Sequence, residues 1–255
     1  MAFDQKVVIV TGASSGIGRA AAEAFAREHA RLVLVSRNET ALSEATRSVA
    51  DGGGTAVGCA VDITSADAPD RIVRTALEGF GGIDVLVNAA GVIATGTIET
   101  TSDETWDAMM GVNLRAPFRL IRAAAPHLKA RKGAIVNVSS VNGLRSFAGV
   151  LAYCVSKAGM DHLTRCAALE MAPLGVRVNA VNPGVTVTNL HRRSGMDETQ
   201  YAAFLERSKE THPLGRPGAP EEIASLILYL ASERAAWMTG ETIPIDGGRQ
   251  LTCLR

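Results

Sequence analysis

The 255-residue chain is poor in aromatic residues and has no excess of charge of either sign. Phe, Trp and Tyr together make up 4% of the residues, so a hydrophobic core has to be built from Ala, Val, Leu and Ile. The 26 Lys and Arg residues are balanced by 26 Asp and Glu residues, which leaves no electrostatic reason to expect binding to nucleic acid or to an anionic membrane. With 47% hydrophobic and 20% charged residues, the composition is that of a globular protein.

Cysteine pairs at metal-ligand or redox spacing are absent as well. Cys59, Cys154, Cys166 and Cys253 are scattered without a CxxC pair, which indicates reduced thiols and no metal site. No apolar run approaches the roughly 20 residues needed to span a bilayer. The first strand begins so near the N-terminus that no charged-then-apolar leader precedes it. These absences predict a cytoplasmic protein.

Short apolar, β-branched runs alternate with longer helical patterns along the chain. The runs are apolar at consecutive positions, as is typical of parallel strands that are buried on both faces. Strands are expected at Val7–Val10, Leu32–Val35, Ala56–Val61, Val85–Asn88, Ala134–Val138, Val176–Val181 and Thr242–Ile245. Helices are expected at Gly18–His29, Glu39–Asp51, Pro69–Phe80, Thr105–Ala130, Ala152–Met171 and Glu221–Ala231. This order predicts an α/β fold: a single Rossmann-type domain over residues 1–255, with about seven parallel strands in a doubly wound sheet and helices on both faces.

One irregular region, at about residues 189–220, interrupts this alternation. It contains a basic cluster at His191–Arg193, an expected helix at Glu198–Lys209 and three prolines. Long excursions beyond the carboxyl ends of strands are commonly lids or specificity loops. We therefore expect a substrate lid here.

A glycine-rich segment follows the first expected strand and opens a helix. It runs Thr11-Gly12-Ala13-Ser14-Ser15-Gly16-Ile17-Gly18. Glycines at these places allow a tight turn and a close approach of the backbone to a pyrophosphate, while the helix start offers N–H groups and the positive end of its dipole. The segment predicts a dinucleotide site formed by Gly12, Ser14, Ser15, Gly16, Ile17 and Gly18.

The residues after the second expected strand bear on the kind of dinucleotide. NAD-preferring sites carry an acid about 20 residues beyond the glycine turn, where it binds the ribose hydroxyls. This chain has Ser36 and Arg37 there. A guanidinium offers charge-assisted hydrogen bonds to a 2′-phosphate, so Arg37 favours NADP(H) and leaves NAD(H) possible. Asp62 and Ile63, which follow the third strand, are expected to border the adenine, or, for Asp62, to cap a turn or helix.

A tyrosine and a lysine lie four residues apart in a helical stretch, at Tyr153 and Lys157. Residues at this spacing share one helix face, and a neighbouring ammonium lowers the pKa of a phenol from about 10 towards the working range. The pair alone is common by chance. Polar and glycine-containing segments at three strand ends add to it: Ser139-Ser140, Asn88-Ala89-Ala90-Gly91 and Pro183-Gly184-Val185-Thr186-Val187-Thr188. Because ligands lie beyond the carboxyl ends of parallel strands, these segments are expected to converge on one site.

With these motifs, the chain resembles the classical short-chain dehydrogenase/reductase family over essentially its whole length. The Thr-Gly-x-x-x-Gly-x-Gly motif of the family corresponds to Thr11–Gly18, and Tyr-x-x-x-Lys corresponds to Tyr153–Lys157. The Asn-Asn-Ala-Gly motif appears as Asn88-Ala89-Ala90-Gly91, with Ala in place of the second Asn. The remaining correspondences are the catalytic Asn at Asn113, the catalytic Ser at Ser140 rather than Ser139, the Pro-Gly motif at Pro183-Gly184 and a terminal Asp246-Gly247-Gly248.

The resemblance implies a reaction and a role for each catalytic residue. A hydride passes between NADPH and a carbonyl carbon, while Tyr153 donates a proton to the carbonyl oxygen. Ser140 stabilises that oxygen. Lys157 binds the nicotinamide ribose and, together with the oxidised nicotinamide, lowers the pKa of Tyr153. Asn113 holds a water that links Lys157 to solvent.

The sequence indicates the substrate pocket less strongly than it indicates the cofactor site. The expected pocket residues are Ser140, Val141, Phe147, Val150, Tyr153, Gly184, Val185 and Leu190, and the expected lid helix adds Tyr201, Phe204 and Leu205. The last three fall at helical spacing, so packing of the lid onto the body is the other explanation for them. Arg192 and Arg193 suit either an acidic substrate or solvent.

The partners expected are a small carbonyl or alcohol substrate and further copies of the chain. The resemblance implies a homotetramer, with Ile223–Leu230 and Thr242–Ile245 as candidate interface elements. Two alternatives stay open: an NAD(H)-preferring dehydrogenase of the same family, and a catalytically silent nucleotide-binding regulatory or scaffold protein. The complete set of four catalytic residues argues against the silent protein.

Overall fold

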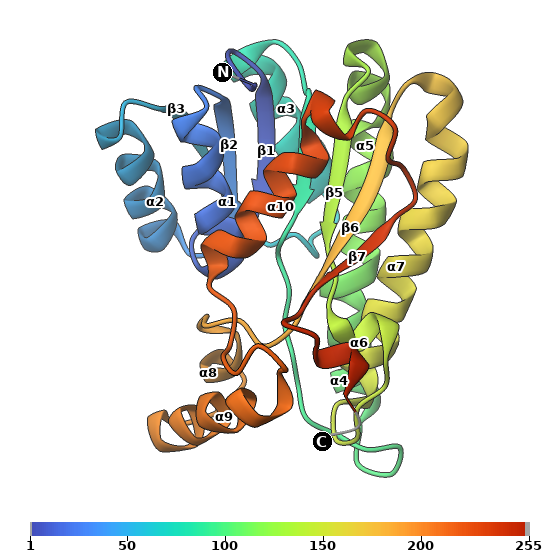
Figure 1. Ribbon diagram of the computed structural model, residues 1–255. Coiled ribbons are helices and arrows are strands. Elements are labelled where there is room, and N and C mark those ends of the chain that lie inside the picture. The colour runs from blue at the N-terminus through green and yellow to red at the C-terminus, as the bar shows by residue number, and fades with distance from the viewer. Residues whose placement is uncertain (1, 253–255) are drawn as a thin grey trace.

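Seven parallel strands form one sheet in the computed structural model, which describes residues 2–252 (Figure 1). The order across the sheet is β3-β2-β1-β4-β5-β6-β7. The strands are β1 (Val7–Thr11), β2 (Arg31–Ser36), β3 (Thr55–Ala60), β4 (Val85–Asn88), β5 (Ala134–Val138), β6 (Arg177–Pro183) and β7 (Thr242–Ile245). The order reverses between β1 and β4, and in such sheets ligands bind at this point. The predicted doubly wound Rossmann-type fold is confirmed.

Helices cover both faces of the sheet (Figure 1). On one face lie α1 (Gly16–Arg27), α2 (Glu39–Asp51) and α10 (Pro220–Ala231). On the other lie α3 (Ala68–Phe80), α5 (Ala116–Arg131) and α7 (Leu151–Met171). The remaining helices are short or lie beyond the sheet: α4 (Asp103–Met110), α6 (Val141–Leu144), α8 (Leu190–Arg193) and α9 (Glu198–Thr211).

The strands owe their place to side chains that are buried on both faces. In β1, Val8 and Val10 pack with α1 and α10, while Val7 and Ile9 pack with the opposite layer. All four are at most 2% exposed. Burying each such side chain contributes about 1.5–3 kcal/mol. This two-sided burial is why the strands appear as consecutive apolar runs in the sequence.

The prediction of one continuous helix at Thr105–Ala130 is wrong, because this stretch is broken in the middle. It consists of α4, a π-helical turn at Gly111–Arg115 and α5. In α-helical register the N–H of residue 117 would bond to the carbonyl of Asn113, but Pro117 has no N–H to donate. The wider π-helical turn falls on this missing bond, and such turns are frequent at functional sites.

The region at about 189–220 extends beyond the carboxyl ends of the strands as α8 and α9. Tyr201 is buried, and its hydroxyl donates to the Thr188 carbonyl at 2.9 Å. Arg192 lies 3.9 Å from the Tyr201 ring centroid and forms an ion pair with Glu198. Tyr201 and Arg192 therefore pack the segment together, as the packing interpretation of the helical stripe predicts.

The two elements expected at a subunit interface have different surroundings in the structure. In α10, Ile223, Ile227 and Leu230 are buried in the chain's own core, so they are not available to a partner. Strand β7 is at the edge of the sheet and, within residues 2–252, pairs with β6 alone. An edge strand exposes backbone groups that another strand can pair with, and Leu226, Leu228 and Tyr229 of α10 are partly exposed, so both elements remain candidates for an interface.

Within residues 2–252 no helix is long and apolar enough to cross a membrane, and no group of three His, Cys, Asp or Glu side chains is placed to hold a metal ion. Cys59, Cys154 and Cys166 are free thiols. Cys253 lies outside the described residues.

Candidate active site

The glycine-rich segment forms a tight turn between β1 and α1. Gly12 and Gly16 have φ angles of +69° and +55°, which favour glycine. A Cβ on Gly18 would lie 2.4 Å from the Gly12 carbonyl oxygen, so the turn closes on itself without room for a side chain. Ser15 caps α1 without a side-chain hydrogen bond, which leaves the N–H groups at the start of the helix directed to the site.

Thr11 joins this turn to the segment after β4. Its hydroxyl oxygen accepts hydrogen bonds from the N–H groups of Ala89 and Ala90 at 3.0 and 3.1 Å. Because Ala89 uses its main chain here, the replacement of the family's second Asn by Ala leaves this connection intact. Thr11 stands in the glycine-rich motif, but nothing in the sequence of the motif indicated this role.

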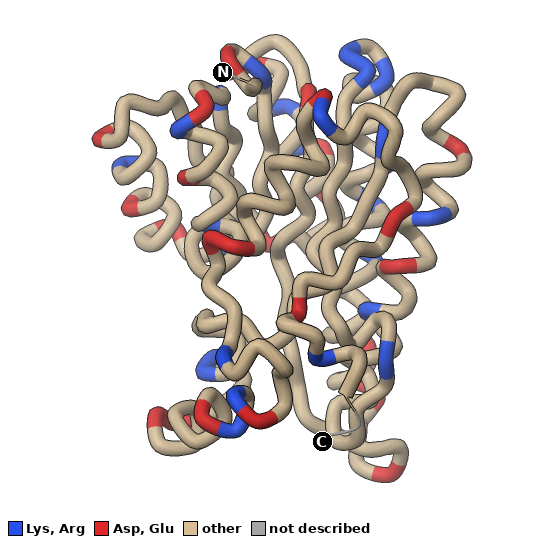
Figure 2. The backbone as a smooth tube through the Cα atoms, viewed as in Figure 1, with Lys and Arg blue, Asp and Glu red and all other residues tan. Residues whose placement is uncertain are grey.

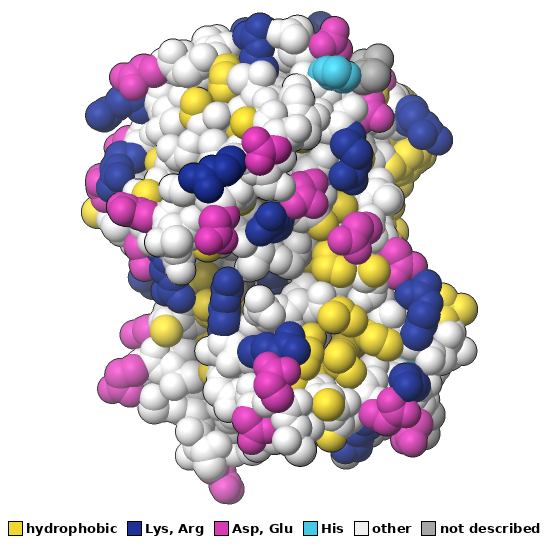
Figure 3. All heavy atoms as spheres, turned by 90° about the vertical axis from the view of Figure 1, so that its left-hand side faces the viewer, with side chains coloured by type: hydrophobic (Ala, Val, Ile, Leu, Met, Phe, Trp, Pro, Cys, Tyr) yellow, Lys and Arg dark blue, Asp and Glu magenta, His cyan; other side chains and the backbone are white. Residues whose placement is uncertain are grey.

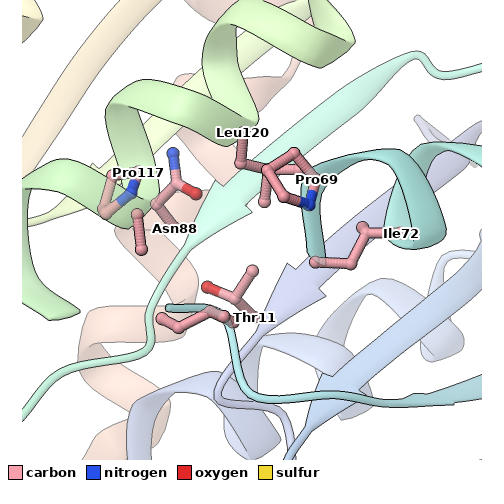
Figure 4. Close-up of a pocket in the computed structure, with 8 residues that line it drawn as sticks. Thr11, Pro69, Ile72, Asn88, Pro117 and Leu120 are labelled. Carbon is pink, nitrogen blue, oxygen red and sulfur yellow. The ribbon is translucent and has the colours of Figure 1, made fainter. Parts of the chain in front are cut away.

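A small cavity of about 10 Å³ lies behind these strand ends (Figure 4). Thr11 from β1 and Asn88 from β4 line it, and Pro69, Ile72, Pro117 and Leu120 close it from α3 and α5. A cavity of this size holds about one water molecule. The side chains of Thr11 and Asn88 therefore face the framework below the site, and the Asn88 side chain is anchored there by a 2.9 Å hydrogen bond to Asn137.

The segment after β2 lies beside the glycine turn. The Ser36 hydroxyl donates to the Ser14 hydroxyl at 2.9 Å, and Asn38 caps α2. Arg37, between them, is exposed. Its charge also acts on Asp62, whose pKa is lowered mainly by hydrogen bonds from Thr64 and to a smaller extent by Arg37. The Asp62 carboxylate thus caps a turn, the second of its two expected roles.

The two serines after β5 are used differently. The Ser139 hydroxyl donates to the Lys157 carbonyl at 3.1 Å, which ties the strand end to α7. The Ser140 hydroxyl donates to Asn142 Oδ1 at 3.2 Å, accepts from the Asn142 N–H at 3.1 Å, and lies near enough to Tyr153 to lower the pKa of the phenol. Ser140 is therefore the serine that faces the tyrosine.

Tyr153 is buried near the start of α7, at 6% exposure. Burial raises the pKa of Tyr153 to about 12, and the hydrogen bond with Ser140 acts in the opposite direction. We expected Lys157 to lower this pKa, and the protein alone does not show that effect. Burial is the largest influence on this pKa, because a phenolate loses its hydration inside the protein.

Lys157 lies behind Tyr153, with its Nζ 5.7 Å from the ring centroid. The Nζ donates to the Val138 carbonyl at 2.8 Å, and burial lowers the pKa of Lys157 to about 8. A Cβ on Gly91 would lie 3.7 Å from this Nζ and 3.4 Å from the Asn113 side-chain oxygen. The glycine after β4 therefore opens the space between Lys157 and Asn113.

Asn113 is fully buried within the π-helical turn. Its side chain bonds to both main-chain groups of Val92 at 2.9 Å and donates to the Ser156 hydroxyl at 3.0 Å. With the side chain engaged in this way, the main-chain carbonyl is the atom of Asn113 that is suited to hold a water.

The segment Pro183–Thr188 closes the site from β6. A Cβ on Gly16 would lie 3.1 Å from the Thr188 side chain, which brings this segment against the glycine turn. His212, after α9, accepts from the Val185 N–H through Nε2 at 3.1 Å, while its Nδ1 is 2.8 Å from the Ser208 carbonyl. His212 is thus a neutral side chain that positions the segment, a role that nothing in its sequence surroundings indicated.

The expected pocket residues separate into two groups. Phe147 and Val185 line a cavity of about 480 Å³, together with Phe204 from α9. Val150 packs in a small cluster with Tyr153, Val141 is buried, and Leu190 begins α8. The cavity is lined by α9, by the segment after α6 and by Val185, and its lining does not include Ser140 or Tyr153.

These features fit a dinucleotide. The turn excludes side chains where a pyrophosphate would approach, the start of α1 is uncapped by side chains, and Arg37 is exposed on the adjoining loop. Tyr153 and Lys157 lie beyond this turn at the carboxyl ends of β4 and β5, where a nicotinamide ribose would be placed in such folds.

The chain is similar over nearly its whole length to known dehydrogenases and reductases. Residues 12–250 match the family model described as enoyl-(acyl carrier protein) reductase. The chain is 38% identical, over 95% of both chains, to 2,5-dichloro-2,5-cyclohexadiene-1,4-diol dehydrogenase from Sphingobium indicum. L-Sorbose reductase from Gluconobacter frateurii, solved in complex with NADPH and L-sorbose, superposes with a TM-score of 0.93 at 34% identity, over 99% of both chains. A cofactor-bound short-chain dehydrogenase/reductase of unknown function from Caenorhabditis elegans gives 0.94 at 35% identity, covering 99% of this chain and 97% of that one.

The fold and the site define a nicotinamide-dependent oxidoreductase of the Rossmann type. The chain belongs to the short-chain dehydrogenase/reductase family.

Proposed function

We propose that the protein is an NADP(H)-dependent oxidoreductase that transfers a hydride between the nicotinamide and a carbonyl or secondary alcohol. The observation that carries this proposal is the placement of the buried Tyr153 with Ser140 beside it and the Lys157 Nζ 5.7 Å from its ring centroid, at the strand ends next to the glycine turn. The nicotinamide supplies or accepts the hydride when bound.

The protein's own residues supply the proton and the polarisation. Tyr153 donates a proton to the substrate oxygen, and Ser140 donates a hydrogen bond to the same oxygen as negative charge develops on it. Lys157 holds the ribose hydroxyls with its ammonium. The main-chain carbonyl of Asn113 positions a water through which Lys157 exchanges protons with solvent.

The cofactor site that we propose is formed by residues from five strand ends and from α7. They are Gly12, Ser14, Ser15, Gly16, Ile17, Gly18, Ser36, Arg37, Asp62, Ile63, Asn88, Ala89, Ala90, Gly91, Tyr153, Lys157, Pro183, Gly184, Val185, Thr186 and Thr188. The preference for NADP(H) rests on Arg37, and the NADPH in the L-sorbose reductase complex supports it. The substrate then lies against Ser140, Val141, Phe147, Val150, Tyr153, Gly184 and Leu190, with residues 189–220 as its lid.

We further propose a homotetramer in the cytoplasm. Phe118, Val155 and Trp237 are 45%, 43% and 100% exposed, and exposed apolar side chains of this size are typical of protein interfaces. Sedimentation at micromolar concentration tests the assembly, and a stable monomer contradicts it. The cytoplasmic location remains a prediction from the sequence.

The test of the activity is a steady-state panel of ketones, aldehydes, sugars and steroids with NADPH and NADH side by side. We expect at least one carbonyl to be turned over, with kcat/KM for NADPH about 10–100 times that for NADH, as a charge-assisted contact to a phosphate provides. A strong NADH preference overturns the role of Arg37. Tight NADPH binding without turnover of any carbonyl or alcohol favours the silent nucleotide-binding protein instead.

A further inference from the structure

The β3–α3 loop, residues 61–67, lies at the same edge of the sheet as the glycine turn. It carries Asp62 and Ile63, two members of the proposed cofactor site. The Val61 N–H donates to the Ser36 carbonyl at 3.1 Å, which places the loop beside the segment after β2. Figure 3 views the molecule from the side of β3 and shows the surface drawn in to a waist at the level where β2 and β3 end in Figure 1. Because ligands bind beyond the carboxyl ends of parallel strands, this loop is expected to border the adenosine half of the cofactor.

Little of the β3–α3 loop is buried. Four of its seven residues are exposed: Asp62, Thr64, Ala66 and Asp67. The Asp62 side chain accepts from the Thr64 N–H at 2.8 Å and from the Thr64 hydroxyl at 2.7 Å. These bonds lie within the loop, so they set its shape and not its position relative to the sheet. A surface loop with few buried contacts is mobile unless other bonds hold it.

Arg119, a half-buried residue of α5, holds this loop from outside. Its Nη1 donates to the carbonyls of Thr64 and Ser65 at 3.3 and 3.1 Å, and its Nη2 donates to the carbonyl of Ala66. A guanidinium carries its donors in a rigid planar fork, so one side chain fixes three consecutive peptide groups. Charges of both signs are spread over the molecule (Figure 2), so Arg119 is set apart by its contacts and not by a charged patch around it.

Helix α5 is a firm support for this contact. Leu120, next to Arg119, is 4% exposed and belongs to the core below the sheet. Figure 4 shows Pro117 and Leu120 of α5 at the small cavity that Thr11 and Asn88 line, and Ile63 lines the same cavity. Arg119 and Ile63 therefore join the loop to α5 and, through the walls of this cavity, to the strand ends below the glycine turn.

We propose that Arg119 is a positioning residue for the cofactor: it holds the β3–α3 loop in place, so that Asp62 and Ile63 are ready to receive the adenosine half of the dinucleotide. A loop that is ordered in advance avoids the loss of affinity that ordering it on binding would cause. Arg119 acts through the three loop carbonyls. This inference rests on the proposed cofactor site, and it concerns the binding of the cofactor and not the transfer of the hydride or the proton.

The binding test measures the Kd of adenosine 2′,5′-bisphosphate and of AMP by calorimetry, because both contain the adenosine half and only the first carries the 2′-phosphate. In Arg119→Met we expect the Kd of each fragment to rise about tenfold, as when a loop must be ordered on binding. A rise for one fragment alone, or for neither, overturns the inference. Failure of either fragment to bind the wild type also overturns it, since a subsite that is ready before binding must hold its own fragment.

Two further variants separate the contact from the charge. Lys129→Met removes the same charge from the exposed surface of α5 and is the matched control, for which both Kd values should stay within about twofold of the wild type. Arg119→Lys keeps the charge but lacks the planar fork, so we expect the Kd of each fragment to rise at least about threefold. Normal affinity in Arg119→Lys, or an equal loss in Lys129→Met, assigns the effect to charge and contradicts the inference.

Hydrogen exchange followed by mass spectrometry reports on the loop in the free protein. In Arg119→Met the peptide that covers residues 61–67 should exchange at least about threefold faster than in the wild type, while peptides from β1 and β5 stay unchanged. Unchanged exchange of the loop overturns the inference. Faster exchange over the whole sheet shows a loss of stability in place of a loss of positioning, and it also contradicts the inference.

Neither measurement needs turnover, so this inference and the proposed function can fail separately. Binding of both fragments that depends on Arg119, without turnover of any carbonyl or alcohol, overturns the proposed reaction and leaves the role of Arg119 in place. Turnover with normal NADPH affinity in Arg119→Met overturns the role of Arg119 and leaves the reaction in place. Arg37→Ser should weaken the binding of the bisphosphate alone, which distinguishes the 2′-phosphate contact from the position of the loop.

Discussion

Removing the Thr11 hydroxyl should break the hydrogen bonds that hold the glycine turn against the segment after β4. In Thr11→Val the shape of the side chain is kept, but the N–H groups of Ala89 and Ala90 lose their common acceptor. A buried donor without an acceptor costs about 1–3 kcal/mol. Both alanines are only half-buried, so water replaces part of the loss. We expect the free energy of unfolding to fall by about 2–3 kcal/mol.

Binding of the cofactor should weaken in the same variant. A Cβ on Gly12 would lie 2.9 Å from the backbone of Ala90, so the two segments are in close contact and a shift of one displaces the other. We expect the Kd for NADPH, measured by fluorescence titration, to rise about tenfold. Urea unfolding at constant pH gives the stability change.

Thr11→Ser is the control, because it keeps the accepting oxygen and loses only a methyl group. It should stay within about 1 kcal/mol of the wild type and bind NADPH normally. If Thr11→Val and Thr11→Ser have equal stabilities and equal NADPH affinities, the Thr11 hydroxyl does not connect the glycine turn to the segment after β4.

Three further predictions follow from charged and titratable groups. Burial lowers the pKa of Lys157 from 10.5 to about 8, so between these pH values the unfolded chain binds more protons than the folded one. The free energy of unfolding of the wild type, measured in urea relative to Lys157→Met, should therefore increase by about 1–2 kcal/mol from pH 7.5 to 9.5. A difference between the two proteins that stays constant over this range contradicts the prediction. Arg37→Ser should raise KM for NADPH about 10–100-fold and leave KM for NADH unchanged. Arg47→Ser on α2 is the control and should change neither KM. Equal effects of Arg37→Ser on both cofactors would remove the basis for the NADP(H) preference. Burial lowers the pKa of His212 below 6.5, so the neutral imidazole that stabilises the fold is lost as the pH falls through this lowered pKa. The free energy of unfolding should differ by about 1–3 kcal/mol between wild type and His212→Ala, and this difference should narrow below pH 6.5. A difference that widens below pH 6.5 refutes the role of neutral His212 as an acceptor.

The strands and the glycine turn were predictable from sequence because each depends on local, strongly constrained features. Consecutive apolar residues such as Val7–Val10 are typical of a sheet buried on both faces, and the positions of Gly12 and Gly18 reflect contacts within one turn. The pairing of distant segments was predictable only through the topology of parallel sheets, which places all the carboxyl ends at one edge.

Features that depend on tertiary neighbours were not predictable in the same way. Pro117 was visible in the sequence, but it lay inside a long helical pattern, and the π-helical turn before it was missed. The position of His212 beside Val185 depends on where α9 ends in space, and the contacts of Arg119 with the β3–α3 loop join residues more than 50 positions apart. The raised pKa of Tyr153 depends on burial, which the spacing of Tyr153 and Lys157 does not report.

The central claim is that the Tyr153 hydroxyl donates the proton in a hydride-transfer reaction. Tyr153→Phe removes that hydroxyl and keeps the ring, so the most direct measurement is kcat of this variant on the best carbonyl of the panel, with the Kd for NADPH measured alongside. We predict that kcat falls by about 10²–10⁴-fold while the Kd stays within about twofold of the wild type. A variant that binds NADPH normally and keeps kcat within a few-fold of the wild type would contradict the account.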